Sequence, residues 1–128
     1  MAVNKEHFEF FQVDTGDDAG WESPEGYPAG VQQKILTGKL DLKNGCGGHT
    51  RLLRFLPGAF TTEPFIHDYW EEVFVIRGDL WVDSDANGQG GEKFEADTYC
   101  CRPPAIPHGP FRSEGGCLLL EQHYYDPQ

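Results

Sequence analysis

Short runs of apolar, aromatic and β-branched residues, separated by glycine and proline, dominate this chain. Turn-forming pairs such as Gly78-Asp79 and Gly115-Gly116 end or precede several of them. No window with the apolar spacing of a helix is free of glycine or proline. The pattern is typical of an all-β sandwich or barrel. It predicts strands over His7–Val13, Val31–Leu40, His49–Leu56, Glu71–Arg77, Leu80–Ser84, Thr98–Arg102 and Cys117–Tyr125.

One predicted strand is apolar on both of its faces, because the run Val73–Ile76 contains no polar residue. One face then meets the interior, and the other meets a covering arm or a partner subunit. The segment Thr15–Gly30 is rich in proline and glycine. We interpret it as a long ordered loop or as an arm that packs on a second subunit. Together these features favour a homodimer.

The length and composition fit one globular domain. The chain has 128 residues, of which 38% are hydrophobic and 24% are charged. We expect a single domain over residues 1–128, with an N-terminal strand and loop at 1–30 and a barrel at about 31–125.

The charge balance is strongly acidic, with 21 acidic against 10 basic residues and a net charge of −11. Such a surface repels phosphate groups, so we expect no nucleic-acid or membrane partner. No segment approaches the ~20 apolar residues that span a bilayer. The first residues also lack the apolar centre of a signal peptide. We expect a cytoplasmic protein whose four cysteines are reduced and mostly buried, at Cys46, Cys100, Cys101 and Cys117.

Two histidines stand where a rigid backbone can hold them. His67 ends one predicted strand, and Glu71 begins the next. His108 follows the proline-rich stretch 103–107, which stiffens its approach. Both histidines can be metal ligands. The alternatives are a hydrogen-bonded histidine at a strand end and a turn residue.

The arrangement resembles the cupin superfamily. The first cupin motif contains a glycine, a His-x-His pair, a glutamate and a second glycine; here Gly58, Phe65-x-His67, Glu71 and Gly78 stand in that order. The second motif, Pro-x-Gly-x-x-His, is similar to Pro103-x-Ala105-x-x-His108. The resemblance extends over Leu52–Leu120. Within this segment the sequence is similar to single-domain cupins related to the metal-binding half of anti-sigma factors, and to small cupin dioxygenases and cyclases. The resemblance implies a jelly-roll barrel, the double-stranded β-helix.

The resemblance also implies a metal site formed by His67, Glu71 and His108. The first histidine of the family motif falls on Phe65, which cannot bind a metal. The remaining set of two imidazoles and one carboxylate is typical of non-haem Fe(II), which is our first expectation. The same ligands also accept Zn(II), Mn(II) or Ni(II).

Several alternatives remain open for this site. His123 on the last strand or His49 before the first motif can replace the lost ligand. Glu72 competes with Glu71, and only one of these neighbours can face inward. Some cupins have also lost their metal and bind only a ligand.

The residues around the motifs suggest a small, mostly apolar pocket. Arg51, Arg54 and Arg102 are the arginines that can reach into the pocket. We expect one of them to bind a carboxylate or enolate of the substrate. The catalytic candidates for proton transfer are Glu72, Tyr69 and His123. The pocket candidates are Phe65, Trp70, Trp81, Tyr99, Phe111 and Arg54.

Three functions fit this reading. The first is a metal-dependent enzyme, a dioxygenase, acting on a small oxygenated molecule such as a diketone, hydroxyketone, enol or phenol. The second is a non-redox Zn- or Ni-dependent isomerase, lyase or polyketide-type cyclase. The third is a sensor module that binds a metal or ligand without turnover.

Overall fold

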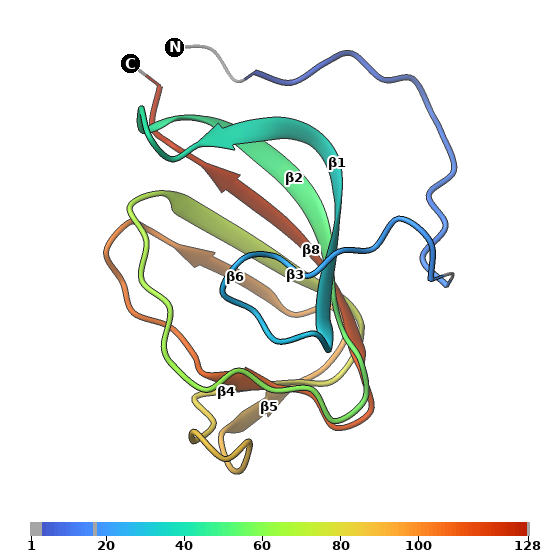
Figure 1. The fold of residues 1–128 in the computed structure, drawn as a ribbon, viewed down its shortest axis with the longest axis vertical. Coiled ribbons are helices and arrows are strands. Elements are labelled where there is room, and N and C mark those ends of the chain that lie inside the picture. Colours follow the sequence, from blue (N-terminus) through green and yellow to red (C-terminus); the bar gives the residue numbers. More distant parts are fainter. Residues whose placement is uncertain (1–3, 17, 128) are drawn as a thin grey trace.

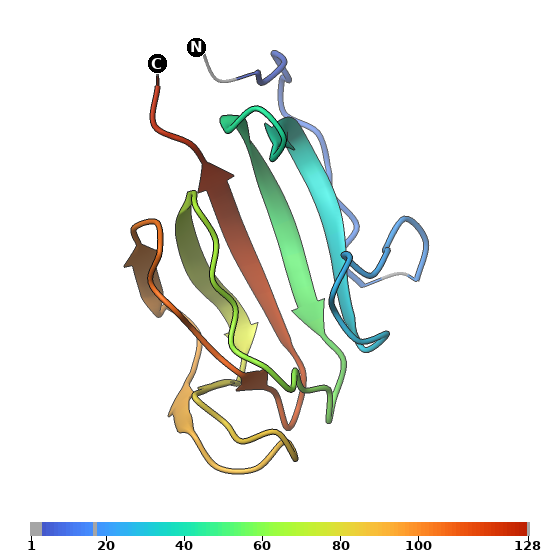
Figure 2. The same cartoon turned by 60° about the vertical axis from the view of Figure 1, so that its left-hand side comes forward.

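Two antiparallel sheets form the body of the molecule in the computed structural model, which describes residues 4–16 and 18–127. The larger sheet has the strand order β1-β2-β8-β3-β6, and the smaller has the order β5-β4-β7 (Figures 1 and 2). The strands are β1 (Val31–Asp41), β2 (Cys46–Phe55), β3 (Trp70–Gly78), β4 (Leu80–Val82), β5 (Glu92–Phe94), β6 (Tyr99–Arg102), β7 (Phe111–Arg112) and β8 (Cys117–Tyr124).

The last strand, β8, lies in the middle of the larger sheet, between β2 and β3 (Figure 1). This order is the jelly-roll pattern that the sequence predicts. It places residues from the end of the chain beside residues from its first half. His123 of β8 is paired in register with His49 on one side and with Glu71 on the other.

The inner face of the larger sheet changes from polar to apolar along the strands. Side chains at alternate positions of a strand share one face, so register partners form rows across the sheet. The first row is polar, the second is mixed and the third is apolar. In that order the rows contain His49, His123, Glu71 and Arg102; Arg51, Glu121, Val73 and Cys100; and Leu53, Leu119 and Val75.

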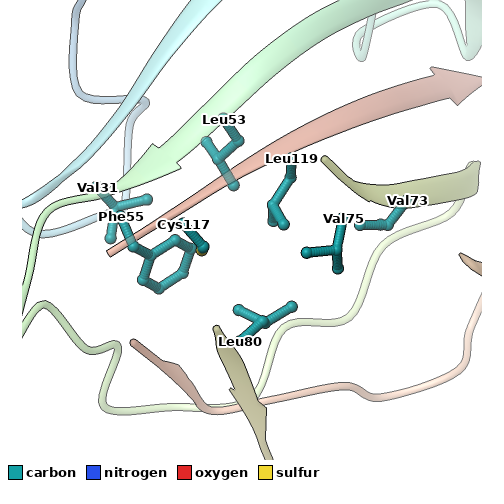
Figure 3. Close-up of a cluster of buried hydrophobic side chains, with 8 residues drawn as sticks. All are labelled: Val31, Leu53, Phe55, Val73, Val75, Leu80, Cys117 and Leu119. Carbon is teal, nitrogen blue, oxygen red and sulfur yellow. The ribbon is translucent and has the colours of Figure 1, made fainter. Parts of the chain in front are cut away.

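The apolar row continues into the hydrophobic core between the two sheets (Figure 3). Leu80 of β4 faces Val75 and Leu119 across this core, and Phe55 and Cys117 close its end. Burial of these side chains supplies the main force that holds the sheets together. The polar rows are thereby fixed to a rigid, close-packed base.

The sequence pattern locates six of the eight strands, within a few residues at each end. The predicted strand His7–Val13 is wrong, because these residues form no strand and Phe8, Phe10 and Phe11 are exposed. The pattern missed β5 and β7, which span three and two residues. Runs this short contain no recognisable period.

The segment before β1 contacts the larger sheet at several points, and its Tyr27 lies on the inner side, against the core. The side-chain oxygen of Asn4 accepts hydrogen bonds from the backbone of Lys39 and Gly48. The guanidinium of Arg54 lies 4.2 Å from the ring centre of Trp21. Of the predicted loop Thr15–Gly30, residue 17 lies outside the described residues, and the rest forms turns and one bridge, between Glu22 and Gln33. The alternative, an arm that packs on a second subunit, stays a prediction. The described part of the chain contains no helix long and apolar enough to cross a membrane.

The four cysteines are free thiols in the structure. Cys117 is buried in the core, and Cys46 and Cys100 are half-buried. Cys101 is exposed, so the expectation of mostly buried thiols holds only in part.

Candidate metal centre

Glu71 is the centre of a cluster of basic side chains. Its carboxylate is only 5% exposed. One carboxylate oxygen, Oε2, lies 2.8 Å from Nε2 of His123 and 3.6 Å from Nε2 of His67. The other, Oε1, lies 3.5 Å from Nε2 of His108 and 3.3 Å from Nη1 of Arg102. A buried carboxylate requires such partners, because burial without them is costly.

Two histidines reach the cluster from loops that face the sheet. His108 is paired with Phe65 through two backbone hydrogen bonds of 2.7 and 2.9 Å. The carbonyl oxygen of His67 accepts a hydrogen bond of 2.9 Å from the amide of Ala105. The two cupin-like motifs are thus joined directly, although they are far apart in the sequence.

Backbone carbonyls determine the orientation of both imidazoles. Nδ1 of His67 lies 3.3 Å from the carbonyl oxygen of Tyr69, and Nδ1 of His108 lies 3.1 Å from that of Ile106. A carbonyl can only accept, so Nδ1 carries the proton in each neutral ring. The lone pairs at Nε2 then point toward Glu71, which is the tautomer that a metal ligand needs.

The donor set fits a divalent metal ion. Nε2 of His67 is buried, and no group among the described residues hydrogen-bonds to it. Such an orphaned nitrogen is unusual and calls for a partner. Ligand atoms of His67, Glu71 and His108 lie within 4.8 Å of one another. Two imidazoles and one carboxylate suit Fe(II), Zn(II), Mn(II) or Ni(II).

His123 and His49 form a hydrogen-bonded pair behind Glu71. Nε2 of His49 lies 3.0 Å from Nδ1 of His123, whose Nε2 lies 2.8 Å from the carboxylate. Since a carboxylate only accepts, His123 donates to Glu71 and accepts from His49. Burial and the nearby His123 lower the pKa of His49 to about 3. His49 thus reaches the carboxylate of Glu71 only through the imidazole of His123.

A buried ion pair occupies the next row of the sheet. Nε and Nη2 of Arg51 donate to one oxygen of Glu121 at 2.9 and 2.7 Å, and Nη1 donates to Gln33 at 2.7 Å. Both charged residues are about 5% exposed or less. The pair neutralises a second carboxylate only 3.6 Å from Nε2 of His123.

The cluster keeps the carboxylate of Glu71 ionised. Burial alone raises its pKa, but the hydrogen bond from His123 outweighs this effect and holds the pKa well below its ordinary value. Burial lowers the pKa of His108 from its ordinary value. An ionised carboxylate beside a neutral His108 is the protonation state that binds a cation.

A cavity of about 330 Å³ opens beside the cluster. Glu71, Arg102, His108 and Glu121 line its polar end beside the cluster, Asp83, Glu92 and Thr98 also line it, and most of the remaining wall is apolar. This combination is typical of a site for a small organic molecule. The apolar lining residues include Tyr27, Leu53, Phe55, Val73, Val75, Leu80, Val82, Phe94, Phe111 and Leu119.

Several predicted residues point away from this cavity. Glu72 accepts hydrogen bonds from the hydroxyls of Tyr99 and Tyr124 on the outer face of the sheet. The indole of Trp70 donates to Asp126. Arg54 donates to Gln32 on the outer face. These positions correct the expectation that Glu72, Trp70 and Arg54 face the site, since they alternate with inward-pointing neighbours.

Of the remaining pocket candidates, Tyr99 and Phe111 line the cavity, and Trp81 and Phe65 do not. The guanidinium carbon of Arg112 lies 3.9 Å from the ring centre of Trp81. Tyr99 borders the cavity, but its hydroxyl lies on the outer face and the residue is 57% exposed. Phe111 lines the cavity as predicted. Phe65 stacks on Tyr27 with the ring centres 4.8 Å apart.

Tyr69 touches the cluster through its ring and its backbone. The ring lies parallel to the imidazole of His67, with the centres 3.9 Å apart, and burial raises the pKa of its hydroxyl. Tyr69 thereby restricts the orientation of His67.

The Arg51–Glu121 pair is not predicted by the sequence pattern. The inward orientation of Glu121 could have been predicted, because alternate residues of a strand share a face and Glu121 alternates with Leu119 and His123. The pairing itself depends on the central position of β8, which a local pattern does not contain. Cys100, and not Cys101, shares the inner face with Arg102.

Comparisons based on sequence found no relatives. No family model matches the chain, and no curated protein matches it.

Comparisons of the structure found many similar folds. An RmlC-like cupin from Shewanella frigidimarina has a TM-score of 0.65 at 19% identity, covering 98% of this chain and 97% of the other. The polyketide cyclase RemF from Streptomyces resistomycificus has a TM-score of 0.63 at 17% identity, covering 92% and 81%. An acetylacetone dioxygenase from Acinetobacter johnsonii has a TM-score of 0.61 at 19% identity, covering 99% and 81%.

The order of the strands and the buried His–Glu cluster define the class of protein as a jelly-roll barrel with a candidate metal centre. The similar structures identify this architecture more closely: the chain has the cupin fold. The expectation from the two sequence motifs is confirmed for the fold.

We predict that the metal-free protein loses stability as the pH falls from 6.5 to about 5. Unfolded histidine takes up a proton near pH 6.5, whereas folded His49 stays neutral down to a pKa of about 3. Protons therefore favour the unfolded state in this range, and the lowered pKa of His108 acts in the same direction. The lowered pKa of Glu71 also favours unfolding in acid, but only below its ordinary value of 4.5.

Urea unfolding at the two pH values measures this loss. His49→Gln removes part of it, whereas His7→Gln, at an exposed position, leaves it unchanged. An equal pH dependence in His49→Gln and the unaltered chain would contradict the burial of a neutral His49.

Proposed function

We propose that this protein is a metal-dependent enzyme in which His67, Glu71 and His108 hold a divalent ion at the wall of the cavity. Its substrate is a small, partly apolar, oxygenated organic molecule such as a diketone, hydroxyketone, enol or phenol, and its reaction is that of a non-haem iron dioxygenase. The observation that carries the proposal is the buried Nε2 of His67, which has no hydrogen-bond partner in the described part of the chain and lies beside an ionised Glu71.

A bound ion would supply Lewis acidity at a substrate oxygen and, in the case of iron, the capacity to use O₂. The protein's own residues determine what can reach it. The apolar rows of the larger sheet and Phe111 form walls that exclude water and contact the body of the substrate. Tyr69 fixes the ring of His67, and the carbonyl of Ile106 fixes the tautomer of His108.

His123 is our candidate for the ligand that replaces the missing histidine of the first motif. Its Nε2 is already the nearest nitrogen to Glu71. As a ligand, Nε2 of His123 must give up the proton that it donates to Glu71, and Nδ1 then carries the ring proton and donates to Nε2 of His49. His49 thereby holds the ring from behind, so we assign it a positioning role.

The second candidate function is a non-redox isomerase, lyase or polyketide-type cyclase with Zn(II) or Ni(II). The structural similarity to a polyketide cyclase and the polar edge of an otherwise apolar cavity support it. His123 is the better base in this case, because Glu72 lies on the outer face.

We further infer a homodimer in the cytoplasm. Phe8, Phe10 and Phe11 of the N-terminal segment are exposed, as are Phe74 and Ile76 on the outer face of β3. A second copy that covers these side chains would remove their apolar surface from water. The free thiols fit a reducing compartment.

Metal binding should stabilise the folded protein measurably. At a thousandfold excess over Kd, the gain in unfolding free energy is about 4 kcal/mol. We predict that a chelator lowers the Tm of metal-loaded protein and that His108→Ala abolishes this shift. His7→Ala is the matched control and should retain it. A chelator that leaves the Tm unchanged would mean that these residues do not hold a metal.

Phe65→His should tighten metal binding, because Phe65 is paired directly with His108 and their rings lie 6.2 Å apart. The new imidazole would restore the ligand that the family motif has at this position. Competition with a fluorescent chelator measures the change in Kd. Phe60→His, at an exposed position, is the control. An unchanged Kd would show that residue 65 does not face the ion.

An oxygen electrode tests the reaction itself. Protein loaded anaerobically with Fe(II) should consume O₂ when a β-diketone such as acetylacetone is added, and His108→Ala should not. Turnover with Zn(II) under argon would instead favour the cyclase or isomerase. Absence of both activities across diketones, hydroxyketones and catechols would leave a binding module and overturn the enzyme proposal.

A further inference from the structure

Arg102 is a cation in the cavity wall whose hydrogen-bonding capacity is largely unused. Its side chain is 18% exposed and lines the cavity. Within the described residues it makes one side-chain hydrogen bond, from Nη1 to Oε1 of Glu71, with a long distance of 3.3 Å. Its guanidinium lies 5.8 Å from the ring centre of Phe111. A guanidinium has five N–H donors, so most of those of Arg102 have no protein acceptor among the described residues.

The other inward-facing arginine is fully engaged. Three nitrogens of Arg51 donate to Glu121 and Gln33 at 2.7 to 2.9 Å, and the residue is 4% exposed. Arg54, the third sequence candidate, lies on the outer face. Arg102 is thus the one arginine among the described residues that lines this cavity, and it can bind a ligand there.

Charge balance gives the sign of that ligand. Arg51 balances Glu121, and the two other acidic lining residues, Asp83 and Glu92, are exposed to solvent. The charges that remain in the less exposed part of the wall are those of Glu71 and Arg102. A divalent ion on Glu71 leaves one positive charge, and Arg102 adds another. Uncompensated charge is costly in a partly buried site, so an anion that enters is favoured.

We propose that Arg102 forms an anion subsite of the cavity and that the substrate carries a carboxylate in addition to the ketone, enol or phenol oxygen of the proposed function. Its carboxylate accepts the paired N–H donors of Arg102, the geometry in which guanidinium groups bind carboxylates most strongly. Its apolar body lies against Val73, Val75, Leu119 and Phe111. The inference deepens the proposed function, since it depends on the ion for part of the charge.

A matched pair of probes tests the subsite. Hexanoate and hexanamide have the same length and differ in charge, and titration calorimetry on Zn(II)-loaded protein compares their affinities. Hexanoate should bind at least about tenfold more tightly, as expected for a charge-assisted hydrogen bond. Arg102→Gln should abolish the preference, and Arg102→Lys should retain part of it.

Arg54→Gln is the control, because it removes the same charge from the outer face and should leave the preference intact. Thermal unfolding verifies that each variant is folded. Equal affinities of the two probes for the unaltered chain, or no binding of either, would overturn the proposal. So would a preference for hexanoate that survives Arg102→Gln, since the anion would then be held elsewhere.

A metal-free variant separates this inference from the proposed function. Glu71→Gln removes the carboxylate that engages Arg102 and removes a ligand of the ion. In this variant the preference for hexanoate should persist without Zn(II), and Arg102→Gln added to it should abolish the preference. This result would support the subsite even if the unaltered chain bound no metal. Equal affinities in Glu71→Gln would overturn the subsite whatever the metal result.

Discussion

The structure depends on one buried carboxylate. Glu71 is an ionised group in the middle of a sheet, and its desolvation is offset by the N–H donors of His123 and Arg102 on the two neighbouring strands. His67 and His108 stand on loops that approach from the opposite side and turn their Nε2 lone pairs toward the carboxylate. The burial of the carboxylate is compatible with folding only when all of these segments are in place.

The position of β8 makes this arrangement possible. A last strand that pairs with β2 and β3 brings His123 beside Glu71 and Glu121 beside Arg51, although each pair is separated by many residues. The same insertion forms the apolar row below, in which Leu119 contacts the core between the sheets (Figure 3). The hydrophobic core and the polar cluster thus lie toward opposite ends of the same strands. Because the core is close-packed, it holds these strands, and the side chains of the site, in one geometry.

Much of the fold could be predicted from the sequence, because the longer strands carry a clear apolar pattern. The choice of Glu71 over Glu72 as the inward residue also followed from motif spacing. The failures concern orientation and pairing. Residue type predicts Trp70 and Arg54 in the pocket, because aromatic and cationic side chains suit a ligand site. Both point to the outer face of the sheet, since each alternates along its strand with inward-pointing neighbours. The Arg51–Glu121 pair was missed because it requires the strand order, which is a property of the whole chain.

The central claim is that His67, Glu71 and His108 converge on one divalent ion. X-ray absorption at the zinc edge of Zn(II)-loaded protein tests it most directly, because the spectrum reports the type of ligand atom and its distance. The account predicts histidine nitrogen and carboxylate oxygen at about 2.0–2.2 Å, with the histidine scattering reduced in His67→Ala. A spectrum dominated by cysteine sulfur at about 2.3 Å, or one that His67→Ala leaves unchanged, would contradict the account.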